Sequence, residues 1–160
     1  MLHFRGTSLV TIPFALLSLG MNPFPGGCPV DKSRYAVLPP GGHVTWREGL
    51  NVSEYPLTHA DVEQAECLLI ARADAVNADL AVNGGGEHIE PAEYYRQYCV
   101  LRDQEGHRIV YLNAFCRLPA AHIPWQQVWV EVDDGGTCYF QALFDLTSGQ
   151  VVEFNINGDA

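Results

Sequence analysis

Basic residues are scarce in this chain. Nine Lys and Arg stand against 19 Asp and Glu among 160 residues, so the formal net charge at pH 7 is −10. Arg117 is the last basic residue. The acidic residues after it are Glu131, Asp133, Asp134, Asp145, Glu153 and Asp159. Such a surface repels phosphate backbones and anionic lipid, which argues against nucleic acid as a partner.

The chain also lacks an apolar run long enough to cross a bilayer, which takes about 20 residues. The run from Leu9 to Leu19 is shorter and interrupted, with Arg5 before it and Gly20 after it. This layout is typical of a secretory signal peptide over residues 1–20, although an ordinary N-terminal strand or helix is the alternative. We therefore expect a secreted or periplasmic protein without a membrane span.

The signatures of metal and nucleophile sites are missing as well. No two of the five cysteines are separated by two residues, and the six histidines show no metal-binding spacing. There is no Gly-x-Ser-x-Gly sequence. The acidic run 133–136 lacks the spaced ligands of a calcium loop and is typical of a hairpin turn. We expect no metal, no cofactor, no catalytic residue and hence no enzyme.

The odd number of cysteines leaves at least one without a partner within the chain. In the sheet expected below, Cys99, Cys116 and Cys138 are not neighbours, and a disulfide needs Cα atoms within about 7 Å. We therefore favour buried thiols. A Cys28–Cys67 disulfide remains the main alternative, and acylation of Cys28 in a lipoprotein is another.

What the sequence does contain is a long β-rich stretch, Gln127 to Asn157. Three-residue turns at 134–136 and 147–149 would place Val132 opposite Cys138 and Phe144 opposite Val152. One face would then carry ten uncharged residues and could anchor a core. They are Val128, Val130, Val132, Cys138, Phe140, Ala142, Phe144, Val152, Phe154 and Ile156.

A further hairpin is expected from Tyr94–Arg102 and Arg108–Cys116, with Asp103 opposite His107. Tyr98 and Val100 then share the inner face with the alternate residues of the second strand. The outer face is also strongly apolar, so we expect it to be covered by the segment from Tyr35 to Trp46 or by a second subunit. Its residues are Tyr95, Leu101, Ile109, Tyr111, Phe115, Trp129, Tyr139, Leu143 and Val151.

Leu57 to Leu80 has the pattern of a long helix. Thr58 and Asp61 form a variant of the capping box, and Leu57 with Val62 has the spacing of a hydrophobic staple. The apolar residues at helical spacing predict the face that packs on the sheet. These residues are Val62, Ala65, Leu69, Ala73, Val76 and Leu80.

Together these elements predict an α+β fold, with one long helix on a four-stranded antiparallel sheet over residues 57–160. Residues 21–56 would be an extended leader with a possible short strand at His43–Leu50. The order of elements resembles the cystatin-like arrangement. Cystatin-type inhibitors carry a Gln-x-Val-x-Gly loop, but residues 126–130 lack its glycine, so protease inhibition is not implied.

Several short motifs in roughly the last 70 residues also resemble a group of small exported bacterial proteins, and this resemblance implies a compartment without implying any chemistry. The motifs are Tyr95-Arg96-Gln97-Tyr98, Asn113-Ala114-Phe115-Cys116, Trp125, Asp133-Asp134-Gly135-Gly136, Tyr139-Phe140 and Asn157-Gly158.

The favoured function is a non-catalytic module that binds a protein or an envelope component, because large aromatic residues often anchor such contacts. The alternative is a self-assembling structural subunit. A small enzyme with a pocket between helix and sheet is less favoured, because the expected inward rows are almost wholly apolar. The candidate binding residues are Trp125, Trp129, Tyr139, Tyr111 and Tyr95.

Overall fold

The computed structural model describes residues 27–40, 49–53, 55–83 and 87–158. The expected signal peptide and most of the expected strand at 43–50 lie outside these residues. Within them, no helix has the length and apolar character needed to span a membrane.

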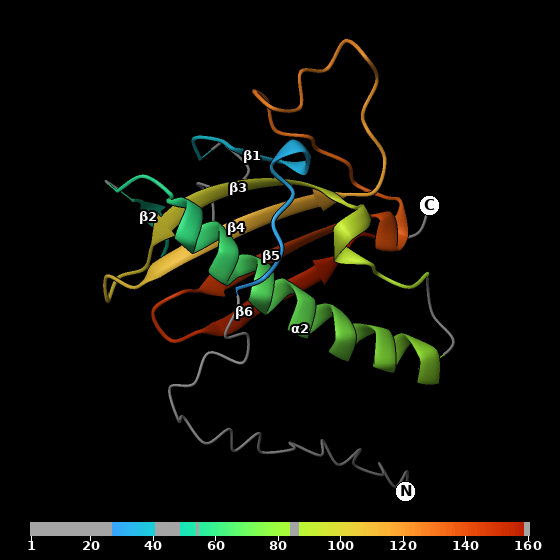
Figure 1. Cartoon of the computed structure of the whole chain (residues 1–160), viewed down its shortest axis with the longest axis horizontal. Coiled ribbons are helices and arrows are strands. Elements are labelled where there is room, and N and C mark those ends of the chain that lie inside the picture. The colour runs from blue at the N-terminus through green and yellow to red at the C-terminus, as the bar shows by residue number, and fades with distance from the viewer. Residues whose placement is uncertain (1–26, 41–48, 54, 84–86, 159–160) are drawn as a thin grey trace, which may run out of the picture.

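The long helix α2 runs from His59 to Asn83 and lies across one face of the sheet (Figure 1). Its start follows the capping pattern in the sequence. The Thr58 backbone N–H donates to Asp61 Oδ2 at 2.7 Å, and the Asp61 N–H donates to Thr58 Oγ1 at 3.3 Å. Val62, Ala65 and Leu69 are completely or almost completely buried. Ala73 is also buried, and Val76 packs against the same core, so the predicted packing face of the helix is confirmed from Val62 to Val76.

In the part of the chain that the structure describes, the sheet has six strands rather than the four expected. Four of them, β3 to β6, form the antiparallel meander, with every consecutive pair side by side. Two short strands from the N-terminal part pair with β3, β1 in parallel and β2 antiparallel. The strands are β1 (Tyr35–Val37), β2 (Asn51–Val52), β3 (Tyr95–Arg102), β4 (Arg108–Phe115), β5 (Tyr139–Asp145) and β6 (Gln150–Ile156). Short 3₁₀ helices are η1 (Lys32–Arg34), η2 (Pro91–Glu93) and η3 (Gly136–Cys138).

The register of the first hairpin is the predicted one, since Val100 pairs with Val110 and Tyr98 with Leu112. The last hairpin agrees in part. Ala142 pairs with Phe154 as expected, but a bulge between Leu143 and Phe144 shifts the remaining pairs. Phe144 therefore pairs with Val151, and Val152 is 61% exposed instead of facing the core.

The strand expected at 128–132 does not form, so β4 pairs directly with β5. Val128 and Val132 are exposed rather than inward-facing. The direct pairing also overturns the predicted cysteine chemistry. Cys116 follows β4 and Cys138 precedes β5, and the two form a disulfide with a Cα–Cα distance of 5.0 Å.

A second disulfide joins Cys28 to Cys67, the alternative that the sequence left open, and so fastens the N-terminal segment to α2. The prediction of buried thiols is correct only for Cys99, which is free and fully buried. Burial raises the pKa of the Cys99 thiol to about 12, so this side chain is an unreactive core residue.

Apolar side chains pack on both faces of the sheet. The inner face and α2 enclose the main core, which includes Leu69, Phe140 and Phe144. The outer face carries a second cluster of Cys99, Leu101, Ile109, Tyr111 and Leu143, with Leu50 and Trp129 packed against it. The outer face is thus covered, but the predicted cover was wrong in part. Trp129 belongs to the connection between β4 and β5, whereas Tyr35–Val37 of the expected covering segment pairs with β3 as a strand.

Candidate binding site

We call residues 117–134, between the two cysteines of the Cys116–Cys138 disulfide, the cover loop. It is the large orange excursion that leaves the end of β4 and returns to β5 in Figure 1. The Cys116 N–H donates to the Cys138 carbonyl at 2.9 Å, so the loop is closed by backbone pairing as well as by the disulfide. A loop of this length in a compact domain usually carries a function.

Two carboxamide side chains on the outer face hold the middle of the cover loop. Gln97 Nε2 donates to the carbonyls of Trp125 and Val128, and Gln97 Oε1 accepts from the Val130 N–H at 2.9 Å. Asn113 Nδ2 donates to the Val130 carbonyl at 2.8 Å and to Gln97 Oε1 at 3.0 Å. Because Gln97 and Asn113 are buried, these bonds replace a neighbouring strand as partners for the loop backbone.

The same row of carboxamide side chains continues across β5 to Asn157, which follows β6. Gln141 Nε2 contacts Asn113 Oδ1 at 3.4 Å and Asn157 Oδ1 at 3.1 Å. Asn157 Nδ2 in turn donates to the carbonyls of Val132 and Asp134. The cover loop is thus fixed to the sheet from its middle to its C-terminal end.

Three of the candidate aromatic residues hold the loop in place. Trp125 packs edge-on against Tyr95 at 5.3 Å between ring centroids and against Phe115 at 5.8 Å. Tyr111 is almost fully buried and meets Trp129 edge-on at 5.7 Å. Tyr95, Tyr111 and Trp125 therefore serve mainly as structural anchors of the loop.

Trp129 and Tyr139 are the two candidate residues that reach a cavity. Trp129 is half-buried, and its Nε1–H donates to the Pro39 carbonyl at 2.9 Å. The cavity has a volume of about 330 Å³. Its walls are Arg117, Pro119, Ile123, Trp129, Val130, Glu131, Val132 and Tyr139. The sequence thus pointed to two wall residues, Trp129 and Tyr139, but not to Ile123 or to the charged wall residues Arg117 and Glu131.

Gly135 sets the position of Tyr139 at the edge of this cavity. Its φ of +104° is a conformation that favours glycine. A Cβ atom at this position would lie 2.5 Å from Tyr139 Cδ2, so the ring packs directly on the glycine backbone. The turn sequence Asp133–Gly136 therefore has a second role beyond reversing the chain.

A second group of ionisable side chains lies between α2 and the sheet, on the face expected to be almost wholly apolar. Tyr98 donates its hydroxyl to Glu66 Oε1 at 2.7 Å, and Arg96 Nε lies 3.1 Å from the same oxygen. All three side chains are buried. Burial raises the pKa of Glu66, and Arg96 and Tyr98 oppose that rise. The pKa of Tyr98 is raised well above its usual value, first by burial and then by the Glu66 charge.

The charges of Glu66 and Arg96 face each other, and neither residue lines the cavity beside Trp129. Arg96 also donates to the Pro91 carbonyl at 2.6 Å, which ties β3 to η2. The arrangement therefore connects α2, the sheet and η2.

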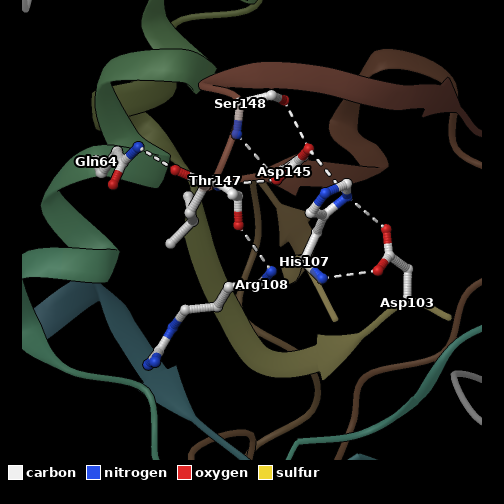
Figure 2. Close-up of polar contacts among 8 residues, drawn as sticks. Gln64, Asp103, His107, Arg108, Asp145, Thr147 and Ser148 are labelled. Atoms are coloured by element: carbon white, nitrogen blue, oxygen red, sulfur yellow. Dashed lines mark hydrogen bonds and ion pairs between the residues drawn. The ribbon is translucent and has the colours of Figure 1, made fainter. Parts of the chain in front are cut away.

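A third polar group surrounds His107 at the opposite end of the sheet (Figure 2). His107 Nδ1 lies 2.9 Å from Asp103 Oδ2 and 4.0 Å from Asp145 Oδ2. Ser148 donates its hydroxyl to Asp145 Oδ2 at 2.6 Å. The serine therefore bonds to a carboxylate, whereas a nucleophile would need a hydroxyl facing the imidazole base. This group stabilises the two turns that it joins.

Comparisons with known protein families, curated proteins and solved structures gave no match to this chain.

Proposed function

We propose that the protein is an exported, non-catalytic binding module that recognises a protein or an envelope component through the cavity beside Trp129. The observation that carries this proposal is the construction of the cover loop. A disulfide closes its base, buried amides hold its backbone, and Trp129 and Tyr139 face a cavity. A surface ordered before binding loses less conformational entropy when the partner docks.

Export is supported by the two disulfides, because such bonds persist mainly in oxidising compartments. Residues 1–20 would be a signal peptide, and the mature protein would be secreted or periplasmic. We also propose that the fold is related to the cystatin-like arrangement, because α2 is followed by the β3–β6 meander. Likeness to small exported bacterial proteins remains part of the same proposal.

The binding proposal can be tested by selecting a random peptide library on the immobilised, disulfide-intact protein. Enriched peptides should lose at least about tenfold in affinity, or about 1.4 kcal/mol, with Trp129→Ala. Ile123→Ala is the second variant, because Ile123 lines the cavity without the ring contact and hydrogen bond that Trp129 makes. Thermal unfolding of each variant checks that it is folded.

The matched control is Val152→Ser, which changes a 61% exposed side chain on β6, away from the cover loop. Affinity for the selected peptides should not change with this control. Peptides that bind all three variants as well as they bind the wild-type protein would place recognition elsewhere and refute the proposal.

A further inference from the structure

The cavity beside Trp129 is small, and its lining is more apolar than polar. At about 330 Å³ it lies at the lower end of the range for ligand pockets, and Ile123, Trp129 and Val132 contribute apolar wall. This size suits one large side chain of a partner better than an extended organic ligand. A partner would then insert an aromatic or branched aliphatic anchor.

The charge around the cavity indicates what should flank that anchor. Arg117 is the only Lys or Arg in the cover loop, against Glu131, Asp133 and Asp134, which are all exposed. The sequence after Arg117 supplies no further basic residue. Arg117 and Glu131 both line the cavity, and the exposed Asp133 and Asp134 directly follow the wall residue Val132 in the sequence. Acidic side chains therefore outnumber basic ones in this part of the chain, and an excess of negative charge steers cationic partners and repels anionic ones.

Resting on the binding function proposed above, we propose that the cavity takes a basic peptide segment, in which one large apolar side chain fills the cavity and neighbouring Lys or Arg side chains contact the acidic rim. A second copy of this chain fits less well, because it would bring another formal charge of −10 to the contact. An anionic lipid surface is repelled for the same reason.

The test uses three short synthetic peptides with blocked ends: Lys-Lys-Phe-Lys-Lys, Glu-Glu-Phe-Glu-Glu and Lys-Lys-Ala-Lys-Lys. Affinity is measured by calorimetry at low and at raised salt. Amide chemical shifts of the labelled protein locate the contact. The basic peptide with Phe should bind at least about tenfold more tightly than the other two, shift the amides of the cover loop, and weaken as salt is added.

Two variants separate the contribution of the apolar wall to peptide affinity from that of the acidic side chains. Ile123→Ala should weaken the basic Phe peptide by removing apolar wall, and Asp133→Asn with Asp134→Asn should weaken it by removing rim charge. The charge control is Asp74→Asn with Glu105→Gln, which removes two exposed carboxylates from α2 and the β3–β4 turn. That control should leave the affinity within about twofold.

Failure of the ligand class and failure of the binding function give different results. Equal binding of the acidic Phe peptide, or of the basic Ala peptide, overturns the ligand class. So does the absence of peptide binding when the library selection still yields ligands that depend on Ile123. If neither the peptides nor the library gives such a ligand, both proposals are wrong. Self-association in sedimentation that disappears with Ile123→Ala would assign the cavity to a second copy.

Discussion

At the scale of single residues, the buried group of Glu66, Arg96 and Tyr98 is the least expected feature of the core. The carboxylate has two polar partners, with Tyr98 at 2.7 Å and Arg96 at 3.1 Å. Removing one partner of a buried ion pair leaves the other charge uncompensated, which typically costs about 3–5 kcal/mol. The cost should therefore depend on which charges remain.

We predict that Glu66→Ala lowers the free energy of unfolding by about 3–5 kcal/mol, because it leaves the Arg96 guanidinium buried without its anion. The double variant Glu66→Leu with Arg96→Met should be clearly more stable than Glu66→Ala, since neither charge remains. Urea unfolding at neutral pH measures both. A cost below about 1 kcal/mol for Glu66→Ala would show that this ion pair is not formed as described.

Asp145 gives a prediction about pH. Burial favours its neutral form, but hydrogen bonds from the Ser148 hydroxyl and from the Ser148 and Thr147 N–H groups, with the charge of His107, leave the pKa of Asp145 lowered. A lowered pKa in the folded state gives stability that is present above the unfolded pKa of about 3.9 and is lost as pH falls through the folded value.

Asp145→Asn should therefore destabilise the protein by about 1 kcal/mol at about pH 5 and by less at about pH 3, because below about 3.9 the carboxyl of the unfolded wild-type chain takes up a proton before the folded one does. Urea unfolding at the two pH values gives the comparison. Glu105→Gln, an exposed carboxylate in the neighbouring turn, is the control and should show no such trend. An Asp145→Asn penalty that stays constant with pH would contradict the assignment.

At the scale of elements, sequence patterns predicted the helix start and the hairpin register that depend on contacts between residues close in the sequence. Thr58 and Asp61 predict the start of α2, and the β3–β4 turn fixes a register that the structure confirms. The shift in the last hairpin was not predictable from alternation. The Asp145 side chain accepts from the Thr147 and Ser148 N–H groups and so favours a longer turn, which the bulge then compensates.

The segment 128–132 shows why part of the site was missed. Its alternating valines fit a strand, yet the Val130 backbone bonds to the side chains of Gln97 and Asn113 instead of to another strand. Alternation indicates an extended backbone and not the identity of its partner. A usable signal was nevertheless present, because the correctly predicted β3–β4 register places Gln97 opposite Asn113 on the apolar outer face.

Gly135 allows an element-scale test of the turn that leads from the cover loop into η3. Gly135→Ala should cost more than the roughly 1–3 kcal/mol of a left-handed non-glycine residue, because the added Cβ also meets the Tyr139 ring at 2.5 Å. Gly149→Ala is the matched control. The φ of Gly149 is +70° and an added Cβ would meet nothing within 4 Å, so Gly149→Ala should cost only the backbone strain of a left-handed alanine. Equal losses in thermal unfolding would remove the role of Gly135 in placing Tyr139.

At the scale of the whole molecule, the two disulfides connect the parts of the chain that the sheet does not. One fastens the segment before β1 to α2, and the other closes the base of the cover loop. The sequence could not reveal the Cys116–Cys138 disulfide, because this bond depends on β4 and β5 being neighbours. Once the expected strand between them is removed, Phe115 pairs with Tyr139 and brings the cysteines on either side together.

This arrangement predicts how many thiols react under each condition. The native oxidised protein should react with iodoacetamide at no cysteine, because Cys99 is fully buried with a pKa of about 12 and the other four are paired. Unfolding in urea without reductant should expose one thiol, and unfolding with reductant should expose all five cysteines. Mass spectrometry of the alkylated protein gives these counts. Three thiols in the oxidised, unfolded protein would show that one disulfide is absent, and peptide mapping would identify it. Absence of the Cys116–Cys138 bond would remove the covalent closure on which the preorganised cover loop depends.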